Sequence, residues 1–290
     1  MVRATTTVDE RLRAGLPSLT RAERQLASRI LDQYPVAALG SITALAKTAA
    51  VSTPTVVRLV QKLGFKGYPD FQNSIRAEVE SMLVSPLAKH DRWAAAAPDT
   101  HILNRFADTV LSNLTSTLAQ IDHAEFDAIA ALLADEKRQV FAMGGRITHA
   151  MADYFVTLML AVRADVRLLP NLSNAWPVAL IDMKPGDVLL VFDIRRYENS
   201  VLQLVEMAKE QGAEVILITD PWISPAATHA RHRLIAQIEA PSAWDSMVSI
   251  TVLVETLLAA VQDLRWDKTA ERMQRLEDLF ARTRFFRKHR

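Results

Sequence analysis

Residues suited to reading a nucleic acid are concentrated between positions 52 and 66. Arg58 carries a guanidinium, which can bind the major-groove edge of guanine through two hydrogen bonds. Lys62 and Lys66 carry ammonium groups that neutralise phosphates, which adds affinity without reading the base sequence. The predicted DNA contacts, all polar or basic, are Ser52, Thr53, Thr55, Arg58, Gln61, Lys62 and Lys66.

Two short helices joined by a tight turn would hold these side chains at a protein surface. The small and apolar positions that such a pair buries are Leu45, Ala49, Val51, Val56 and Leu59. Ser52 is a favourable N-cap, and Pro54 falls in the first turn, where a missing N–H costs nothing. Ala50 stands where the turn usually has glycine with a positive φ. The segment predicts a helix-turn-helix whose second helix enters the major groove. The alternative is a plain helical hairpin with a solvated basic face.

A second set of polar residues follows apolar segments in the C-terminal part of the chain. Predicted strands cover residues 138–143, 165–169, 187–193, 214–219 and 233–238. Helices are predicted between and after them near 148–162, 173–181, 199–211 and 244–264. Apolar strands separated by helices predict a parallel sheet covered on both faces, which is a doubly wound α/β domain. In such sheets, ligands bind beyond the C-terminal ends of the strands.

The loops after the first and third strands carry most of the candidate ligand contacts. Glycines at a helix start let backbone N–H groups approach an anion, and paired arginines bind carboxylates or phosphates. The candidates are Gly144, Gly145, Arg146, Thr148, Asp193, Arg195, Arg196, Tyr197, Ser200, Thr219 and Asp245. In the alternative interpretation the arginines are surface charges or subunit contacts, and Thr219 and Ser242 cap helices.

The segment VSTPTVVRLVQKLGFKGYPDFQNSIRAEV resembles the N-terminal domain of RpiR/MurR-type bacterial regulators, and LGFKGYPDF is its most specific part. The resemblance covers residues 17 to 80 closely. In that family a sugar isomerase (SIS) domain follows, and KPGDVLLVFD, AKEQGAEVILITD, SPAATHA and WDSMVSITVLVETLL resemble its segments. The resemblance implies a five-stranded parallel sheet of order 2-1-3-4-5. It also implies a one-component regulator that binds a phosphosugar-like effector and forms dimers or tetramers.

The chain departs from this family pattern in the loop after the third strand. Phosphosugar-binding SIS domains usually carry a Ser-x-Ser-Gly-x-Thr run there, whereas this loop reads DIRRYENS. Either the arginines replace the missing hydroxyls, or the pocket is degenerate and the SIS fold serves only for assembly. A third hypothesis is a sugar-phosphate isomerase-type enzyme. That enzyme would need a general base, and neither loop offers a Glu–His pair, so we expect no catalytic residues.

Composition and charge limit the remaining possibilities. Residues 1–80 hold 11 Lys and Arg against 7 Asp and Glu, while the rest hold 23 against 26, so the basic end suits nucleic acid. Cysteine is absent, which excludes disulfides and thiolate metal sites. His229 and His232 lack a third ligand, and we expect no metal and no cofactor. Neither a membrane-length apolar run nor a leader peptide is evident, which predicts a cytoplasmic protein without a membrane partner.

We therefore predict an all-α helix-turn-helix domain over residues 1–82 and a linker over 83–100. An α/β SIS-type domain for effector binding and oligomerisation follows over 101–266, and a basic helix over 267–290. The predicted partners are a double-stranded DNA operator, a small anionic effector (a phosphosugar or sugar acid), and further copies of the chain in a homodimer or homotetramer.

Overall fold

The computed structural model of the chain describes residues 7–32, 34–83, 87, 89, 90, 93 and 100–283. These residues form two compact units. The first extends to Thr109 and includes Ala240–Trp244, and the second comprises Val110–Glu239 and the chain from Asp245 onward. The predicted linker over 83–100 lies largely outside the described residues, so the domain boundaries stay predictions.

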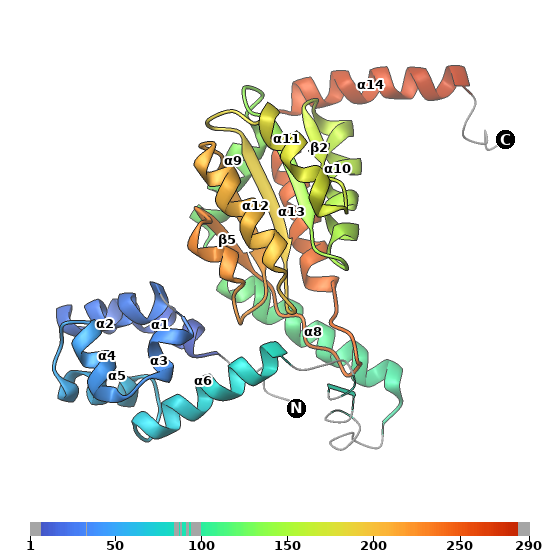
Figure 1. The fold of residues 1–290 in the computed structure, drawn as a ribbon. Helices are drawn as coiled ribbons and strands as arrows, with labels where there is room; N and C mark the ends of the chain where they lie inside the picture. The colour runs from blue at the N-terminus through green and yellow to red at the C-terminus, as the bar shows by residue number, and fades with distance from the viewer. Residues whose placement is uncertain are drawn as a thin grey trace. The chain divides into compact units, whose positions relative to one another are not determined.

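The first unit is helical (Figure 1). Its helices are α1 (Val8–Gly15), α2 (Arg21–Asp32), α3 (Val36–Leu39), α4 (Ile42–Thr48), α5 (Thr53–Lys62) and α6 (Tyr68–Leu83). Helix α2 begins with a capping box, in which the Thr20 amide donates to the Glu23 carboxylate at 2.9 Å. One apolar core joins the helices, and its fully buried members include Leu26, Ile30, Val56, Leu59 and Phe71. This core fixes the orientation of α5.

The second unit contains a five-stranded parallel sheet of order β2-β1-β3-β4-β5, as the resemblance implied. The strands are β1 (Val140–Gly144), β2 (Val166–Leu168), β3 (Val188–Asp193), β4 (Glu214–Thr219) and β5 (His232–Ile235). All five predicted strands are confirmed within a few residues at each end. β1 and β3 are neighbours whose crossovers lead to opposite sides, so the loops after them flank the position where strand order reverses.

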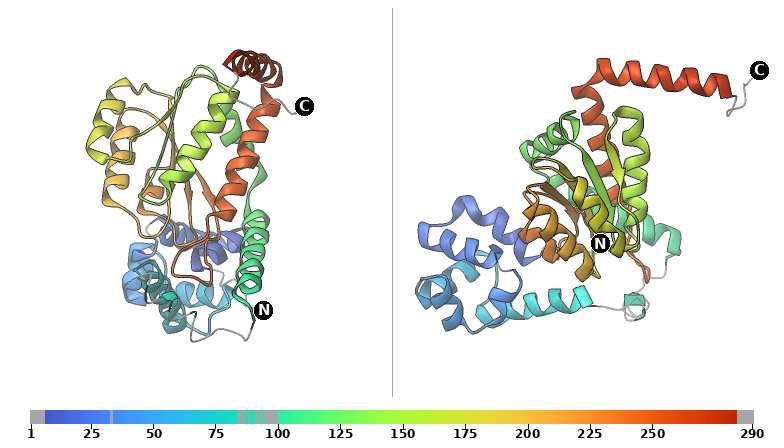
Figure 2. Two further views of the ribbon diagram at one scale, coloured as in Figure 1. Left: turned by 90° about the vertical axis from the view of Figure 1, so that its right-hand side faces the viewer. Right: turned by 45° about the horizontal axis from the view of Figure 1, so that its top comes forward.

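Helices cover both faces of this sheet (Figures 1 and 2). One face carries α11 (Trp176–Asp182) and α12 (Asn199–Glu210), which pack on alternate strand residues such as Phe141, Leu189 and Leu217. The other face carries α9 (His123–Ala134), α10 (His149–Val162) and α13 (Val248–Leu264). Since strand side chains alternate between the faces, two apolar helix layers explain why β3 is buried along its whole length.

The remaining α-helices that the structure describes are α8, α13 and α14. Helix α13 begins at Val248, so the prediction of a helix from residue 244 was wrong, and Ser242 caps no helix there. Helix α8 (Ile102–Gln120) precedes the sheet, and α14 (Trp266–Thr283) lies in the range 267–290 that was predicted as a basic helix, of which residues 284–290 lie outside the described residues. Within the described part of the chain, none of the helices combines the length and apolarity that a membrane crossing requires.

Candidate functional site

The turn between α4 and α5 has the geometry of a helix-turn-helix. Ala50 adopts a φ of 52°, which confirms the left-handed conformation expected at this position. The Ala50 amide donates to the Lys47 carbonyl at 3.1 Å, and the Val51 amide donates to the Ala46 carbonyl at 2.9 Å. These bonds end α4 and turn the chain into α5, where Pro54 occupies the first turn.

Helix α5 is divided into a buried face and an exposed face. Val56, Leu59 and Val60 are fully buried in the core of the first unit. Arg58 and Gln61 lie on the opposite face and are exposed. The exposed predicted DNA contacts are Ser52, Arg58, Gln61, Lys62 and Lys66, and Thr53 is half-buried. Burial of one face holds the helix in place, which leaves the other face able to enter a groove.

Two of the predicted DNA contacts have other partners. Thr55 is only 5% exposed, and its hydroxyl lies 2.9 Å from the Ser52 hydroxyl and 3.3 Å from Arg58 Nη2. Thr55 is therefore a supporting residue in the structure and not a surface contact. The Lys62 ammonium lies 2.7 Å from the buried Glu23 carboxylate, and this hydrogen-bonded pair lowers the pKa of Glu23. Arg58 thus remains the exposed cation on α5 that is free of an acidic partner among the described contacts.

In the loop after β1, two of the four candidates have structural roles. A Cβ on Gly144 would lie 2.4 Å from the backbone of Thr148, so glycine is required here by the close start of α10. The Thr148 hydroxyl is buried and donates to the Phe192 carbonyl at 2.6 Å. Thr148 therefore joins the loop to β3, and its predicted contact with a ligand stays a prediction.

The other two candidates in this loop face an unpredicted carboxylate. The Arg146 amide donates to Glu198 Oε1 at 2.9 Å, and a Cβ on Gly145 would lie 3.0 Å from the same oxygen. The Ser200 hydroxyl lies 3.5 Å from Glu198 Oε2. The Arg146 side chain is exposed, and the contact with Glu198 is made by the Arg146 backbone amide. Glu198 thus brings the loops after β1 and β3 together.

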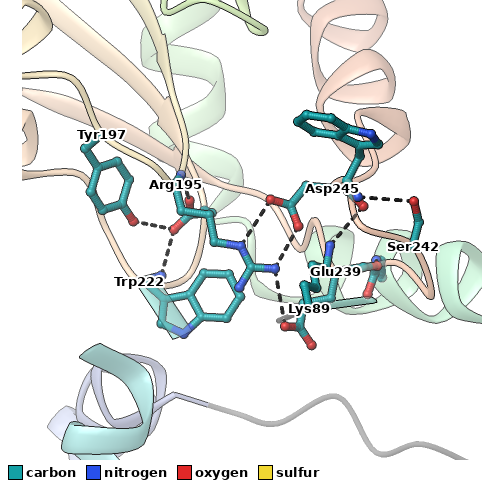
Figure 3. A network of polar contacts seen from close by, with 10 residues as sticks. Lys89, Arg195, Tyr197, Trp222, Glu239, Ser242 and Asp245 are labelled. Carbon is teal, nitrogen blue, oxygen red and sulfur yellow. Dashed lines mark hydrogen bonds and ion pairs between the residues drawn. The ribbon is translucent and has the colours of Figure 1, made fainter. Parts of the chain in front are cut away.

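Arg195 is the centre of a polar network at the strand ends (Figure 3). Its Nη2 and Nε lie 2.7 and 3.1 Å from the two carboxylate oxygens of Asp245, and Nη2 lies 3.4 Å from Glu239. The guanidinium carbon lies 4.0 Å from the centre of the Trp222 ring. Burial disfavours the charged guanidinium, but the hydrogen bonds and charge of Asp245 outweigh it and raise the pKa of Arg195.

These contacts give two of the predicted site residues structural partners. The Arg195 side chain is only 6% exposed and is already bound by a carboxylate on two hydrogen bonds. Both carboxylate oxygens of Asp245 accept hydrogen bonds from Arg195, and the predicted contact of Asp245 with a sugar hydroxyl stays a prediction. Arg196, by contrast, is exposed, and its predicted role stays a prediction.

Buried carboxylates end β3 and follow β4. Asp193 accepts a hydrogen bond from the Ser224 hydroxyl, and burial raises the pKa of Asp193 to about 7. Asp220 accepts hydrogen bonds from the Tyr197 hydroxyl at 2.7 Å and the Arg195 amide at 2.6 Å, and burial raises its pKa to about 6. These bonds hold the loop after β3 against the end of β4.

Tyr197 and Thr219 also have structural partners at these strand ends. Burial and the neighbouring Asp220 raise the pKa of Tyr197 well above its usual value. Thr219 is fully buried, and its hydroxyl accepts from the Ser224 amide at 3.2 Å. Thr219 thus has a structural partner, and its predicted role in lining the crevice stays a prediction.

The two histidines of the His-x-x-His pair point to different partners. His232 Nδ1 lies 3.1 Å from Glu125, and His229 Nε2 lies 3.5 Å from Glu206. No group of three potential metal ligands was found among the residues that the structure describes.

Two family models match the chain, each on one of the regions described above. The helix-turn-helix domain of the rpiR family matches residues 6–82, and the SIS domain matches residues 132–260. The first match covers the turn at Ala50 and the whole of α5, and the second covers all five strands. The chain thus joins a helix-turn-helix domain of the rpiR family of transcriptional regulators to a SIS domain.

Individual relatives agree with this assignment. The regulator is 27% identical over 222 residues to the HTH-type transcriptional regulator HexR of Pseudomonas aeruginosa, covering 72% of each chain. Its fold is similar to the sugar isomerase domain of an RpiR transcription factor from Sphaerobacter thermophilus, with a TM-score of 0.56, 20% identity and coverage of 61% of this chain and 97% of that one. It is also similar to Vibrio vulnificus NanR complexed with ManNAc-6P, with a TM-score of 0.54, 18% identity and coverage of 94% and 97%.

One candidate residue of the effector site, Glu198, was not predicted from the sequence, because the two arginines in the same loop indicate a positively charged site. A carboxylate one residue before a predicted helix is ordinarily interpreted as an N-cap or as a favourable charge at the helix start. Its contact with the loop after β1 is 52 residues distant in sequence, and no local pattern reveals it.

Proposed function

We propose that this regulator binds a double-stranded DNA operator through α5 and that a small carbohydrate-related anion controls the binding. The observation that carries the DNA proposal is the exposed face of α5, where Arg58 and Gln61 project from a helix whose other face is fully buried. Arginine and glutamine are suited to the edges of guanine and adenine, respectively. Lys66 would add a phosphate contact.

The effector proposal rests on the sheet and on the related proteins. The reversal of strand order between β1 and β3 creates the place where open α/β sheets bind ligands. NanR, which shares this fold, was solved with a sugar phosphate. We propose a phosphosugar or a sugar acid as the effector, held at Gly145 and Arg146 from the loop after β1 and by Arg196 from the loop after β3.

Regulation requires two copies of α5 and a coupling between the units. A homodimer or homotetramer would present two α5 helices to operator half-sites about one helical turn apart. A coupling of about 1 to 3 kcal/mol would change operator affinity five- to 150-fold when the effector binds. We include no catalytic role, because Ser224 and Tyr197 already hold the buried carboxylates Asp193 and Asp220. Such a regulator acts in the cytoplasm, where its operator lies.

The DNA proposal is tested by replacing Arg58. Fluorescence anisotropy would compare the full chain and Arg58→Ala on a duplex from the upstream region of its own gene, at fixed salt. Loss of a bidentate base contact is expected to weaken specific binding by about 1 to 3 kcal/mol, with little change on an unrelated duplex.

Arg76→Ala is the matched control. Arg76 is an exposed arginine on α6, so the variant loses the same charge from the same unit. Its affinity for the operator is expected to stay within about twofold of the parent, as for a charge that reads no base. Equal losses for the two variants would assign Arg58 to general electrostatics and remove it from base recognition.

A further inference from the structure

We infer that Glu198 occupies the place that the effector's anionic group would take, and thereby sets the affinity of the effector site for anions. The inference rests on the proposed effector function, and it names a residue that would leave the site when the effector enters. It also explains how a crevice without the usual serine run is filled.

The first observation is the position of the carboxylate. Glu198 Oε1 accepts the Arg146 amide hydrogen at 2.9 Å and lies where a Cβ on Gly145 would approach it to 3.0 Å. Glycine therefore leaves room for an oxygen against the backbone just before α10 begins. Backbone N–H groups at the start of a helix are the usual partners of a bound phosphate or carboxylate.

The second observation is that the Glu198 side chain does not cap the backbone amides of its own helix, α12. It occupies the N-cap position of α12, where an acidic side chain normally accepts a hydrogen bond from the second or third amide of the helix. Its carboxylate accepts no backbone amide hydrogen of α12, all of whose residues are described; Oε2 lies 3.5 Å from the Ser200 hydroxyl of that helix, and Oε1 reaches the loop after β1. The Glu198 carboxylate thus binds a backbone amide of the loop after β1 in place of an amide of α12.

The third observation is the charge around this position. The buried carboxylates Asp193 and Asp220 lie at the neighbouring strand ends. Arg195, in contrast, is neutralised by Asp245. With Glu198 in place, a second anion at the Arg146 amide would meet a like charge at hydrogen-bond distance. An anionic ligand can therefore bind to this amide only when the Glu198 carboxylate moves away.

Displacement of Glu198 gives the effector a route to the rest of the protein. Glu198 immediately precedes α12, and its contact with Arg146 ties the start of α12 to the start of α10. An anion that replaces the carboxylate takes over the hydrogen bond from the Arg146 amide and frees the loop after β3 from the loop after β1. Binding and loop release are thus one event.

The test uses inorganic phosphate as the probe and the full chain as the protein. Calorimetry at pH 8 and constant ionic strength would give phosphate affinity, and the backbone amide resonance of Arg146 would report where phosphate binds. Glu198→Ala removes the competing carboxylate, and Glu198→Gln keeps its shape without its charge. We expect Glu198→Ala to bind phosphate about tenfold tighter or more than the parent, since a hydrogen bond to a charged group is lost from the competitor. Glu198→Gln is expected to lie between them.

Glu210→Gln is the matched control, because Glu210 is an exposed carboxylate at the other end of α12. Phosphate affinity in this variant is expected to equal that of the parent. Equal affinity of Glu198→Ala, Glu198→Gln and the parent, with the Arg146 resonance shifting in all three, would overturn the role of Glu198 and leave the effector site standing. Failure of phosphate to bind any of the proteins would overturn both this inference and the anionic effector. DNA binding is judged separately through Arg58.

Discussion

Replacing Asp245 by asparagine is expected to destabilise the second unit, because it leaves Arg195 charged and buried. The Arg195 side chain is 6% exposed and the Asp245 side chain 14%, and two hydrogen bonds of 2.7 and 3.1 Å join them. Removal of one member of a buried ion pair typically costs about 3 to 5 kcal/mol. Glu239 remains at 3.4 Å and compensates part of the charge, so we expect a loss of about 3 kcal/mol, at the lower end of that range.

Hydrogen exchange is the appropriate assay, because it reports on one unit of a two-unit chain. The slowest amides of β3 and β4 give the free energy of opening of the second unit in the parent and in Asp245→Asn. Asp182→Asn is the control, since Arg167 and Asp182 form a pair at 3.1 Å whose side chains are 49% and 60% exposed. That variant should lose less than about 1 kcal/mol.

Two outcomes decide the interpretation of Arg195. If Asp245→Asn and Asp182→Asn have equal opening free energies, Arg195 is not held by Asp245 and is again a candidate for effector binding. If the interpretation is correct, the double variant Arg195→Met, Asp245→Leu should recover most of the stability lost in Asp245→Asn, since apolar side chains of similar volume replace a buried pair without its desolvation cost. Arg195→Ala is then a test of stability and a poor test of effector binding.

Two further predictions concern the turn and the buried carboxylates. Ala50→Gly should stabilise the first unit by about 1 kcal/mol, because the exposed Ala50 adopts a φ of 52°. As a control, Ala131→Gly in α9 should destabilise the second unit by a similar amount. Hydrogen exchange measures the stability of both units, and a loss of stability in both variants would contradict the strain at the turn. Asp193 has a pKa raised from 3.8 to about 7, so the stability that its protonated form contributes is full below about pH 4 and is lost as the pH rises through about 7. Asp193→Asn should therefore have a flatter dependence of unfolding free energy on pH between about 4 and 7 than the parent, and parallel profiles in urea titrations would refute this assignment.

The fold was largely predictable because its signals are local. The apolar runs around Leu190 and Ile216 and the helical segments between them predict a doubly wound sheet, and all five strands were found. The turn at Ala50 was located from the spacing of Leu45 and Leu59 despite the missing glycine. The start of α13 was misplaced because Trp244 and Asp245 resemble a helix start, whereas Asp245 instead reaches Arg195, 50 residues away in sequence.

The site was less predictable because its contacts are not local. A sequence shows that Arg195 is cationic but not that a carboxylate already binds it, and it shows Thr148 as a hydroxyl but not its bond to the Phe192 carbonyl. Thr55 was expected at the surface because it lies three residues before the exposed Arg58, but its side chain is buried. The topology predicts the end of the sheet at which the crevice lies. Only the three-dimensional packing shows which side chains there lack a partner within the protein.

Cross-linking from α5 to operator DNA tests most directly whether α5 is the helix that contacts the bases. The chain has no cysteine, so Gln61→Cys provides a single thiol on the exposed face of α5, and Gln203→Cys provides one on the exposed side of α12. Each variant, carrying a short photoactivatable thiol reagent, would be irradiated with the operator duplex. If α5 lies in the major groove, cross-links form from position 61 to bases in each half-site and none form from position 203. Equal labelling from both positions, or none from position 61 while the operator is bound, would contradict it.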